Sequence, residues 1–113
     1  MQNYSLANRG PGDISQPAPD RIIEGDPVFT TWSFTETPIA TGLWAATPGR
    51  HLVIRDQQTW EQFHILEGEI ILTAEGGAPE SYKAGDIVHI LPGYRGEWQT
   101  VSPVLKHYIT VQL

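Results

Sequence analysis

Several polar residues in the middle of the chain have types and spacings that suit binding of a small charged molecule. His51, Arg55 and Gln57 alternate along one predicted strand and therefore share a face, and Glu61 follows on the next strand. If Arg55 and Glu61 both face the interior, they form a charge pair, and the planar guanidinium also suits a carboxylate, phosphate or ureido ligand. We expect Arg55, Gln57, Glu61 and His51 to bind such a ligand.

Glu61 is the candidate catalytic residue, as a general base. Burial raises the pKa of a carboxyl group, whereas pairing with a cation such as Arg55 lowers it, and the sequence does not decide between the two effects. Phe63 and Trp98 are expected to complete the ligand site as an apolar or stacking wall. The alternative is that Arg55 and Glu61 form a structural ion pair and that Trp98 belongs to the core.

The elements that position these residues are predicted to be strands. From Pro27 onward, short runs rich in Val, Ile, Thr and aromatic residues are separated by turn sequences such as TPG, EGG, KAGD and LPG. About eight short strands of this kind indicate a β-sandwich or a small barrel. In the last run, 105–113, apolar residues alternate with polar ones, so we expect the odd positions to face the core, with His107 as a buried core histidine.

Residues 1–26 are rich in proline and glycine and show little periodicity. Proline fixes φ and removes donors that a central strand needs, so this segment is predicted to be an extended arm. Ile14, Ile22 and Ile23 can attach it to the sheet or to a partner subunit. The chain is therefore expected to consist of an arm over 1–26 and a β-barrel domain over 27–113.

Length and composition exclude several classes of function. The 113 residues fit one domain, and seven Lys and Arg against thirteen Asp and Glu give a net charge of −6. Such a chain lacks the basic surface that nucleic-acid or membrane binding requires. With no cysteine, it has no thiolate nucleophile and no zinc–cysteine site. No signal-peptide pattern and no long apolar run is present, so we expect a cytoplasmic protein.

Two stretches resemble the sequence motifs of the cupin superfamily. They are PGRHLVIRDQQTWEQFHILEGE, in which Gly49, Glu61 and Gly68 have the spacing of the first motif, and KAGDIVHILPGYRGEW, which carries the glycine-aspartate and proline-glycine turns of the second. Cupins are small jelly-roll β-barrels with the ligand site inside the barrel mouth. The resemblance thus implies an all-β, single-domain jelly-roll barrel.

A finer similarity is to the ureidoglycine-aminohydrolase-like branch of cupins. The features that carry it are Gly42-Leu43-Trp44, a LEGE hairpin, the AGD turn, the GYRGEW segment at 93–98 and the K-x-Y of Lys106 and Tyr108. This branch includes many short single-domain proteins of unassigned function. The resemblance implies a small-molecule ligand and a homodimer, and it does not specify a reaction.

Metal-binding cupins of this kind hold their ion with three histidines and one glutamate. Here only Glu61 is kept, and Arg55, Gln57 and Gly96 stand at the histidine positions. A guanidinium cannot donate a lone pair to a metal and repels it, so we expect no metal ion and no other cofactor. The alternative is a relocated divalent metal ion held by Glu61 and His51.

The chain is therefore expected to be a cupin that binds a small polar, anionic metabolite without the usual metal. Family analogy suggests hydrolysis or isomerisation of that metabolite, but the residues do not decide whether the protein is an enzyme. One alternative is a metal-dependent enzyme with a rearranged site. A second is a non-catalytic interaction module that works as a homodimer through its edge strands and arm.

Overall fold

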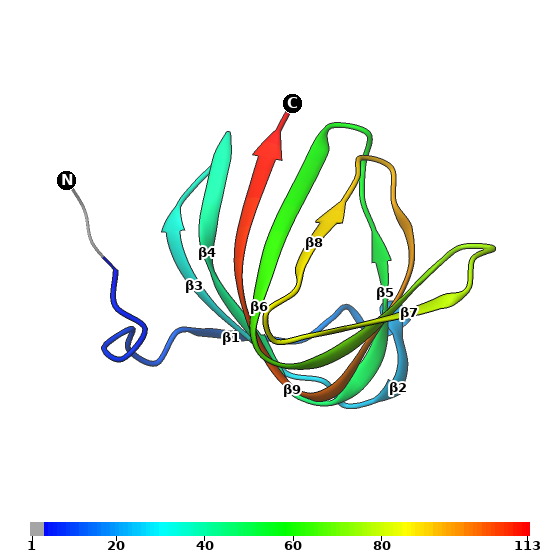
Figure 1. Cartoon of the computed structure of the whole chain (residues 1–113), viewed down its shortest axis with the longest axis horizontal. Helices are drawn as coiled ribbons and strands as arrows, with labels where there is room; N and C mark the ends of the chain where they lie inside the picture. Colours follow the sequence, from blue (N-terminus) through cyan, green and yellow to red (C-terminus); the bar gives the residue numbers. More distant parts are fainter. Residues whose placement is uncertain (1–3) are drawn as a thin grey trace.

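The computed structural model describes residues 4–113, and Figure 1 shows their sheet curled into a cup. This part of the chain contains nine strands and one short 3-10 turn. The elements are β1 (Asp13–Ser15), η1 (Pro19–Arg21), β2 (Ile22–Gly25), β3 (Phe29–Thr35), β4 (Ile39–Ala46), β5 (Gly49–Ile54), β6 (Thr59–Ala74), β7 (Pro79–Lys83), β8 (Ile87–Ile90) and β9 (Arg95–Gln112). Within this range, no helix has the length and apolar character needed to cross a membrane.

Strand β9 organises the sheet. Its first part pairs with β5, its second part pairs with β4, and β6 pairs with it along most of its length. The path β1-β3-β4-β9-β5-β2 forms one side of the cup, and β6 carries β7 and β8 on the other. All these pairings are antiparallel. The fold is therefore an all-β, single-domain jelly-roll barrel, as predicted.

The LEGE segment does not form the expected hairpin. Strand β6 continues through Gly68, and its register against β9 shifts on both sides of Glu67 and Glu69, so the segment is a bulged bend within one long strand. Gly68 has φ +89°, and a Cβ there would collide with the backbone of Pro103. A glycine at positive φ marks a bulge as well as a turn, so the residue pattern alone did not separate the two.

The apolar core lies inside the curled sheet. It is built mainly from inward side chains of β6, β8 and β9, and it comprises Ala46, Val53, Phe63, Ile65, Ile70, Leu72, Val88, Ile90, Trp98 and Val104. The apolar and aromatic side chains of these strands thus fill one part of the barrel interior.

The prediction for the two faces of the last strand is wrong. Lys106, Tyr108 and Thr110 line an internal cavity, whereas His107 lies on the outer face, with its ring 6.5 Å from that of Phe34. The alternation has period 2 as expected, but its phase is reversed, because this part of the barrel interior is a polar cavity. The apolar side chain of Leu105 is buried on the outer face instead.

The N-terminal segment follows two edges of the sheet. Ile14 in β1 pairs with Thr30 of β3, and Ile22 in β2 pairs with His51 of β5. The attachment is made by backbone pairing, since the side chains of Ile14 and Ile23 are exposed. Between the two strands, η1 brings part of the segment to the internal cavity. Residues 1–3 of the expected arm lie outside the described residues.

Candidate ligand-binding site

A cavity of about 460 Å³ lies inside the barrel and is lined from three directions. The N-terminal segment contributes Pro17, Ala18 and Arg21. Strands β3, β4 and β5 and the residues just after β5 contribute Phe29, Trp44, His51, Leu52, Val53 and Arg55, and β6 and β9 contribute Glu61, Trp98, Lys106, Tyr108 and Thr110. The wall therefore combines aromatic rings with a few convergent polar groups, which is the usual make-up of a small-molecule site.

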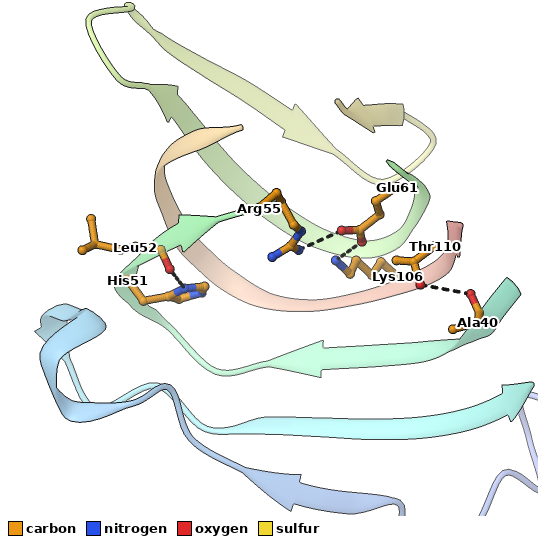
Figure 2. A network of polar contacts seen from close by, with 7 residues as sticks. All are labelled: Ala40, His51, Leu52, Arg55, Glu61, Lys106 and Thr110. Carbon is orange, nitrogen blue, oxygen red and sulfur yellow. Dashed lines mark hydrogen bonds and ion pairs between the residues drawn. The ribbon is translucent and has the colours of Figure 1, made fainter. Parts of the chain in front are cut away.

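Glu61 is the centre of a charged network within this cavity. Its side chain is 3% exposed, and its two oxygens accept from different cations. Arg55 Nη2 donates to Oε1 at 2.8 Å, and Lys106 Nζ donates to Oε2 at 2.9 Å. Figure 2 shows the three side chains converging from β6, β9 and the segment after β5. Both carboxylate oxygens are thus engaged by protein cations.

Lys106 is enclosed by aromatic rings. Its Nζ lies 4.7 Å from the ring centroid of Trp44, 4.3 Å from that of Phe63 and 4.7 Å from that of Trp98. Aromatic faces attract a cation, most strongly where water is excluded. This enclosure and the carboxylate of Glu61 together stabilise a charge that would otherwise be costly inside the barrel.

The pKa values of the pair follow from burial and from the neighbouring charges. Burial alone would raise the pKa of Glu61, but attraction by Lys106 and Arg55 outweighs it and holds this pKa below its ordinary value. Burial lowers the pKa of Lys106, and Glu61 only partly offsets that effect. Glu61 is therefore ionised at neutral pH, and Lys106 loses its proton more readily than an exposed lysine does.

His51 offers a neutral ring to the same cavity. Burial lowers its pKa, and the nearby charges of Lys106 and Arg55 act in the same direction. Nδ1 lies 3.2 Å from the carbonyl oxygen of Leu52, which can only accept, so we assign the hydrogen to Nδ1. Nε2 is then an acceptor, and it is buried with no hydrogen-bond partner among the described residues. An unpaired buried acceptor is costly unless a bound molecule donates to it.

Comparison with known proteins decides the family. Residues 33–108 match the EutQ-like cupin domain family. The chain belongs to this family. No protein of curated function matches the chain.

Solved structures agree with this cupin assignment. A DUF861-family protein of unknown function from Pseudomonas syringae pv. tomato is 25% identical over 86% of this chain, with a TM-score of 0.75. The chain spans 42% of the length of that protein. A Thermotoga maritima DUF861-family protein is 33% identical over 58% of this chain and 73% of its own length (TM-score 0.55). A Salmonella typhimurium protein assigned as EutQ is 22% identical over 78% of this chain and 71% of its own (TM-score 0.65), which shows the shared fold.

The cupin barrel brings together part of the residue set predicted from the sequence. His51, Arg55, Glu61 and Trp98 line one cavity. Phe63 is not part of that lining, but its ring supports Lys106 from the core.

Gln57 is placed away from the other predicted ligand residues. It is exposed in the turn after β5, close to Gly93, and it does not line the cavity. Strand β5 ends at Ile54, so the alternation that would put Gln57 on the same face as His51 and Arg55 stops before it is reached.

Two charged residues of the cavity wall, Lys106 and Arg21, were missed by sequence reasoning. Lys106 was assigned to the outer face, although the K-x-Y motif had singled it out without giving it a role. Arg21 lies in the N-terminal segment, where no pattern predicts a position over the barrel mouth. For Lys106, a usable signal exists: it is one of only two lysines, and it directly follows the apolar residues Val104 and Leu105 in a predicted strand.

The residues at the usual cupin metal position do not fit a metal ion. The carboxylate of Glu61 already accepts from Arg55 and Lys106, and these two cations would repel a divalent ion placed next to it. In residues 4–113, no cluster of three His, Cys, Asp or Glu side chains has a geometry that could hold a metal. Glu61 with His51 alone supplies fewer ligands than transition metals require.

Proposed function

We propose that this EutQ-like cupin domain binds a small organic anion inside its barrel without a metal ion. The observation that carries the proposal is the charge of the cavity wall. The wall contains three cationic side chains, Arg21, Arg55 and Lys106, and one carboxylate, that of Glu61, whereas the chain as a whole has a net charge of −6. A positive interior in an acidic protein favours an anionic ligand and disfavours a cation.

Arg55 supplies the recognition group. Its guanidinium has five N–H donors in a fixed plane, and its side chain remains 29% exposed beside Glu61. A ligand carboxylate or phosphate can therefore be bound by the donors that do not contact Glu61, with the geometry that favours paired hydrogen bonds.

The unpaired acceptor of His51, Nε2, favours a ligand that also carries a hydrogen-bond donor. A molecule that also carries a hydroxyl or an amide N–H can donate to Nε2 and remove the cost of its burial. Hydroxy acids and ureido acids have both an anionic group and such a donor. The sequence resemblance to ureidoglycine-aminohydrolase-like cupins supports the ureido class. Hydrolysis and isomerisation are the reactions that this resemblance suggests, and Glu61 is the candidate base on the ground of its position in the cavity.

The test is ligand-induced thermal stabilisation of the full chain, measured with a panel of small carboxylates, phosphates, hydroxy acids and ureido acids. We expect some panel members to raise the melting temperature of the parent and of the R95A variant, because Arg95 is exposed, pairs with Glu75 and does not line the cavity. The R55A variant should fold but lose the stabilisation. A parent protein that no anion stabilises, or an R55A variant with the full shift, would overturn the proposal.

A second candidate function, homodimer formation, is favoured by the outer face of strands β4, β9, β6 and β8, which lie side by side in Figure 1. Residues paired in register share this face, and those with exposed or partly exposed side chains are Ile39, Thr41, His107, Ile109, Val111, Trp60, Gln62, His64, Ile87 and His89. None of these residues has a fixed charge. Two copies that each carry −6 can approach most easily through an uncharged surface, so a second copy of the chain is the proposed partner.

Sedimentation equilibrium distinguishes this candidate. We expect a dimer that the I87E substitution on the outer face dissociates, while I14E, at an isoleucine of β1 that is also well exposed, does not. A parent protein that sediments as a monomer at high concentration would exclude it.

A further inference from the structure

The buried amine of Lys106 lies in the same cavity as the proposed anion site. Resting on the proposed anion site, we propose that Lys106 forms an imine with the carbonyl group of a small oxo acid whose carboxylate is bound by Arg55. This assigns Lys106 as a covalent catalytic residue and names 2-oxo acids as the substrate class.

The environment of Lys106 suits a reactive amine. The chain has two lysines, and only Lys106 is enclosed, with a side chain that is 6% exposed. Exposed amines are mostly protonated at neutral pH and therefore poor nucleophiles, whereas desolvation in an apolar enclosure favours the neutral amine. Burial lowers the pKa of Lys106 accordingly. The rings of Trp44, Phe63 and Trp98 also limit the access of water that would hydrolyse an imine.

The placement of the two cations in one cavity suits the substrate class. Arg55 Nη2 and Lys106 Nζ contact the two oxygens of one carboxylate, that of Glu61, at 2.8 and 2.9 Å. The two cations are therefore held at the two oxygens of a single carboxyl group. Figure 2 shows Arg55 and Lys106 reaching the same carboxylate from two sides. A 2-oxo acid has its carboxylate and its carbonyl carbon directly bonded, so its carboxylate can lie on Arg55 while its carbonyl carbon approaches Lys106.

Glu61 is placed to move the protons of this step. Its Oε2 first takes a proton from the Lys106 ammonium group, with which it is already hydrogen-bonded. The Nζ lone pair then forms a bond to the carbonyl carbon, and the C=O π pair moves onto the oxygen. After this oxygen receives the proton held by Glu61 and a second proton from nitrogen, the C–O bond breaks and water leaves. Amine and carbonyl thus give imine and water, with no change of oxidation state.

Reductive trapping tests the inference on the unmodified chain. The protein is incubated with pyruvate and sodium cyanoborohydride, and the modified residue is located by intact-mass measurement and peptide mapping. We expect one reduced adduct on Lys106, exceeding modification of the exposed Lys83 by about tenfold or more. Adducts confined to Lys83 or to the N-terminal amine, or no adduct, would overturn the assignment.

Matched variants and a second ligand separate this inference from the proposed function. K83R should keep the adduct, and K106M should lose it. Circular dichroism reports whether K106M folds. If K106M does not fold, peptide mapping of the parent still shows whether the adduct is on Lys106. Lactate has the same carboxylate but no carbonyl. If pyruvate and lactate both stabilise the parent and no Lys106 adduct forms, anion binding holds and the imine is excluded. If no anion of the thermal panel stabilises the parent and no adduct forms, both proposals fail.

Discussion

Lys106 and Glu61 form an ion pair that is buried inside the barrel, with 2.9 Å between Nζ and Oε2. Their side chains are 6% and 3% exposed, and they come from the neighbouring strands β9 and β6. The two residues are 45 positions apart in sequence, so only barrel closure brings them together. A buried pair of this kind is rarely the most stable solution, because apolar residues of the same volume often pack as well or better. Its presence beside a cavity therefore points to a functional role.

Replacing Glu61 should destabilise the fold markedly. In E61Q, the ammonium group of Lys106 remains buried without its counter-ion, and breaking a buried pair from one side costs about 3–5 kcal/mol of unfolding free energy. Urea unfolding followed by tryptophan fluorescence measures this loss. The matched control is E75Q, since Glu75 pairs with Arg95 on the surface and such pairs contribute about 0–1 kcal/mol.

The double variant E61L/K106M sharpens the same prediction. Removing both charges leaves no buried ion, so the double variant should recover much of the stability that E61Q loses. If E61Q is as stable as the parent, or if the double variant is less stable than E61Q, the account of a costly buried pair is wrong.

Much of the fold was predictable because it depends on local patterns. Short β-branched and aromatic runs between glycine and proline turns specify strands, and the spacing of Gly49, Glu61 and Gly68 resembles a cupin motif. The pairing of Arg55 with Glu61 also follows from their positions on adjacent segments. What these patterns do not specify is the side of a strand that faces the interior.

Lys106 shows why this information was missing. Apolar and polar residues alternate along its strand, so one face is apolar and the other is polar. The usual assumption that the apolar face is internal was wrong here, because Lys106 on the polar face lines the cavity. The barrel interior here holds a polar cavity, and the apolar residues at 105, 109 and 111 lie on the outer face. Deciding between the two faces requires the partners of the strand, which are far away in sequence. The same holds for Arg21, which reaches the cavity only because β2 pairs with β5.

The stability of the protein should fall as the pH drops below about 6.5, and His51 should be a cause. Burial lowers the pKa of His51, so between that lowered value and about 6.5 the unfolded chain binds a proton that the folded chain does not. The free energy of unfolding therefore rises with pH across this window, and the contribution from His51 is lost on acidification. Urea unfolding at a series of pH values measures the slope.

Substitution of single histidines identifies the source of that slope. H51N should flatten the pH profile over this window, whereas H64N should leave it unchanged, because His64 is exposed on the outer face. An H51N profile as steep as that of the parent would show that His51 is not the responsible group.

Gly68 should be among the least replaceable glycines. G68A places a side chain at φ +89° and against the backbone of Pro103, which cannot move without disturbing the pairing of β6 with β9. We expect a loss of about 3 kcal/mol or more, since strain and a backbone clash add. G76A is the control: Gly76 has φ +74° but open space around it, so only the conformational cost of about 1 kcal/mol applies. Equal losses in thermal or urea unfolding would contradict the close approach at Gly68.

Arg21 should contribute to ligand affinity without contributing to the fold. It lines the cavity from η1, opposite the barrel residues, and it is otherwise exposed, so R21A should leave the unfolding free energy nearly unchanged. Loss of one charged hydrogen-bond donor to an anion should weaken binding by about tenfold. Isothermal titration with the best anion of the thermal panel measures this change. The control is R9A, because Arg9 belongs to the same N-terminal segment but lies over the ring of Trp32, away from the cavity. An R21A variant that binds as tightly as R9A would show that the segment covers the cavity without contacting the ligand.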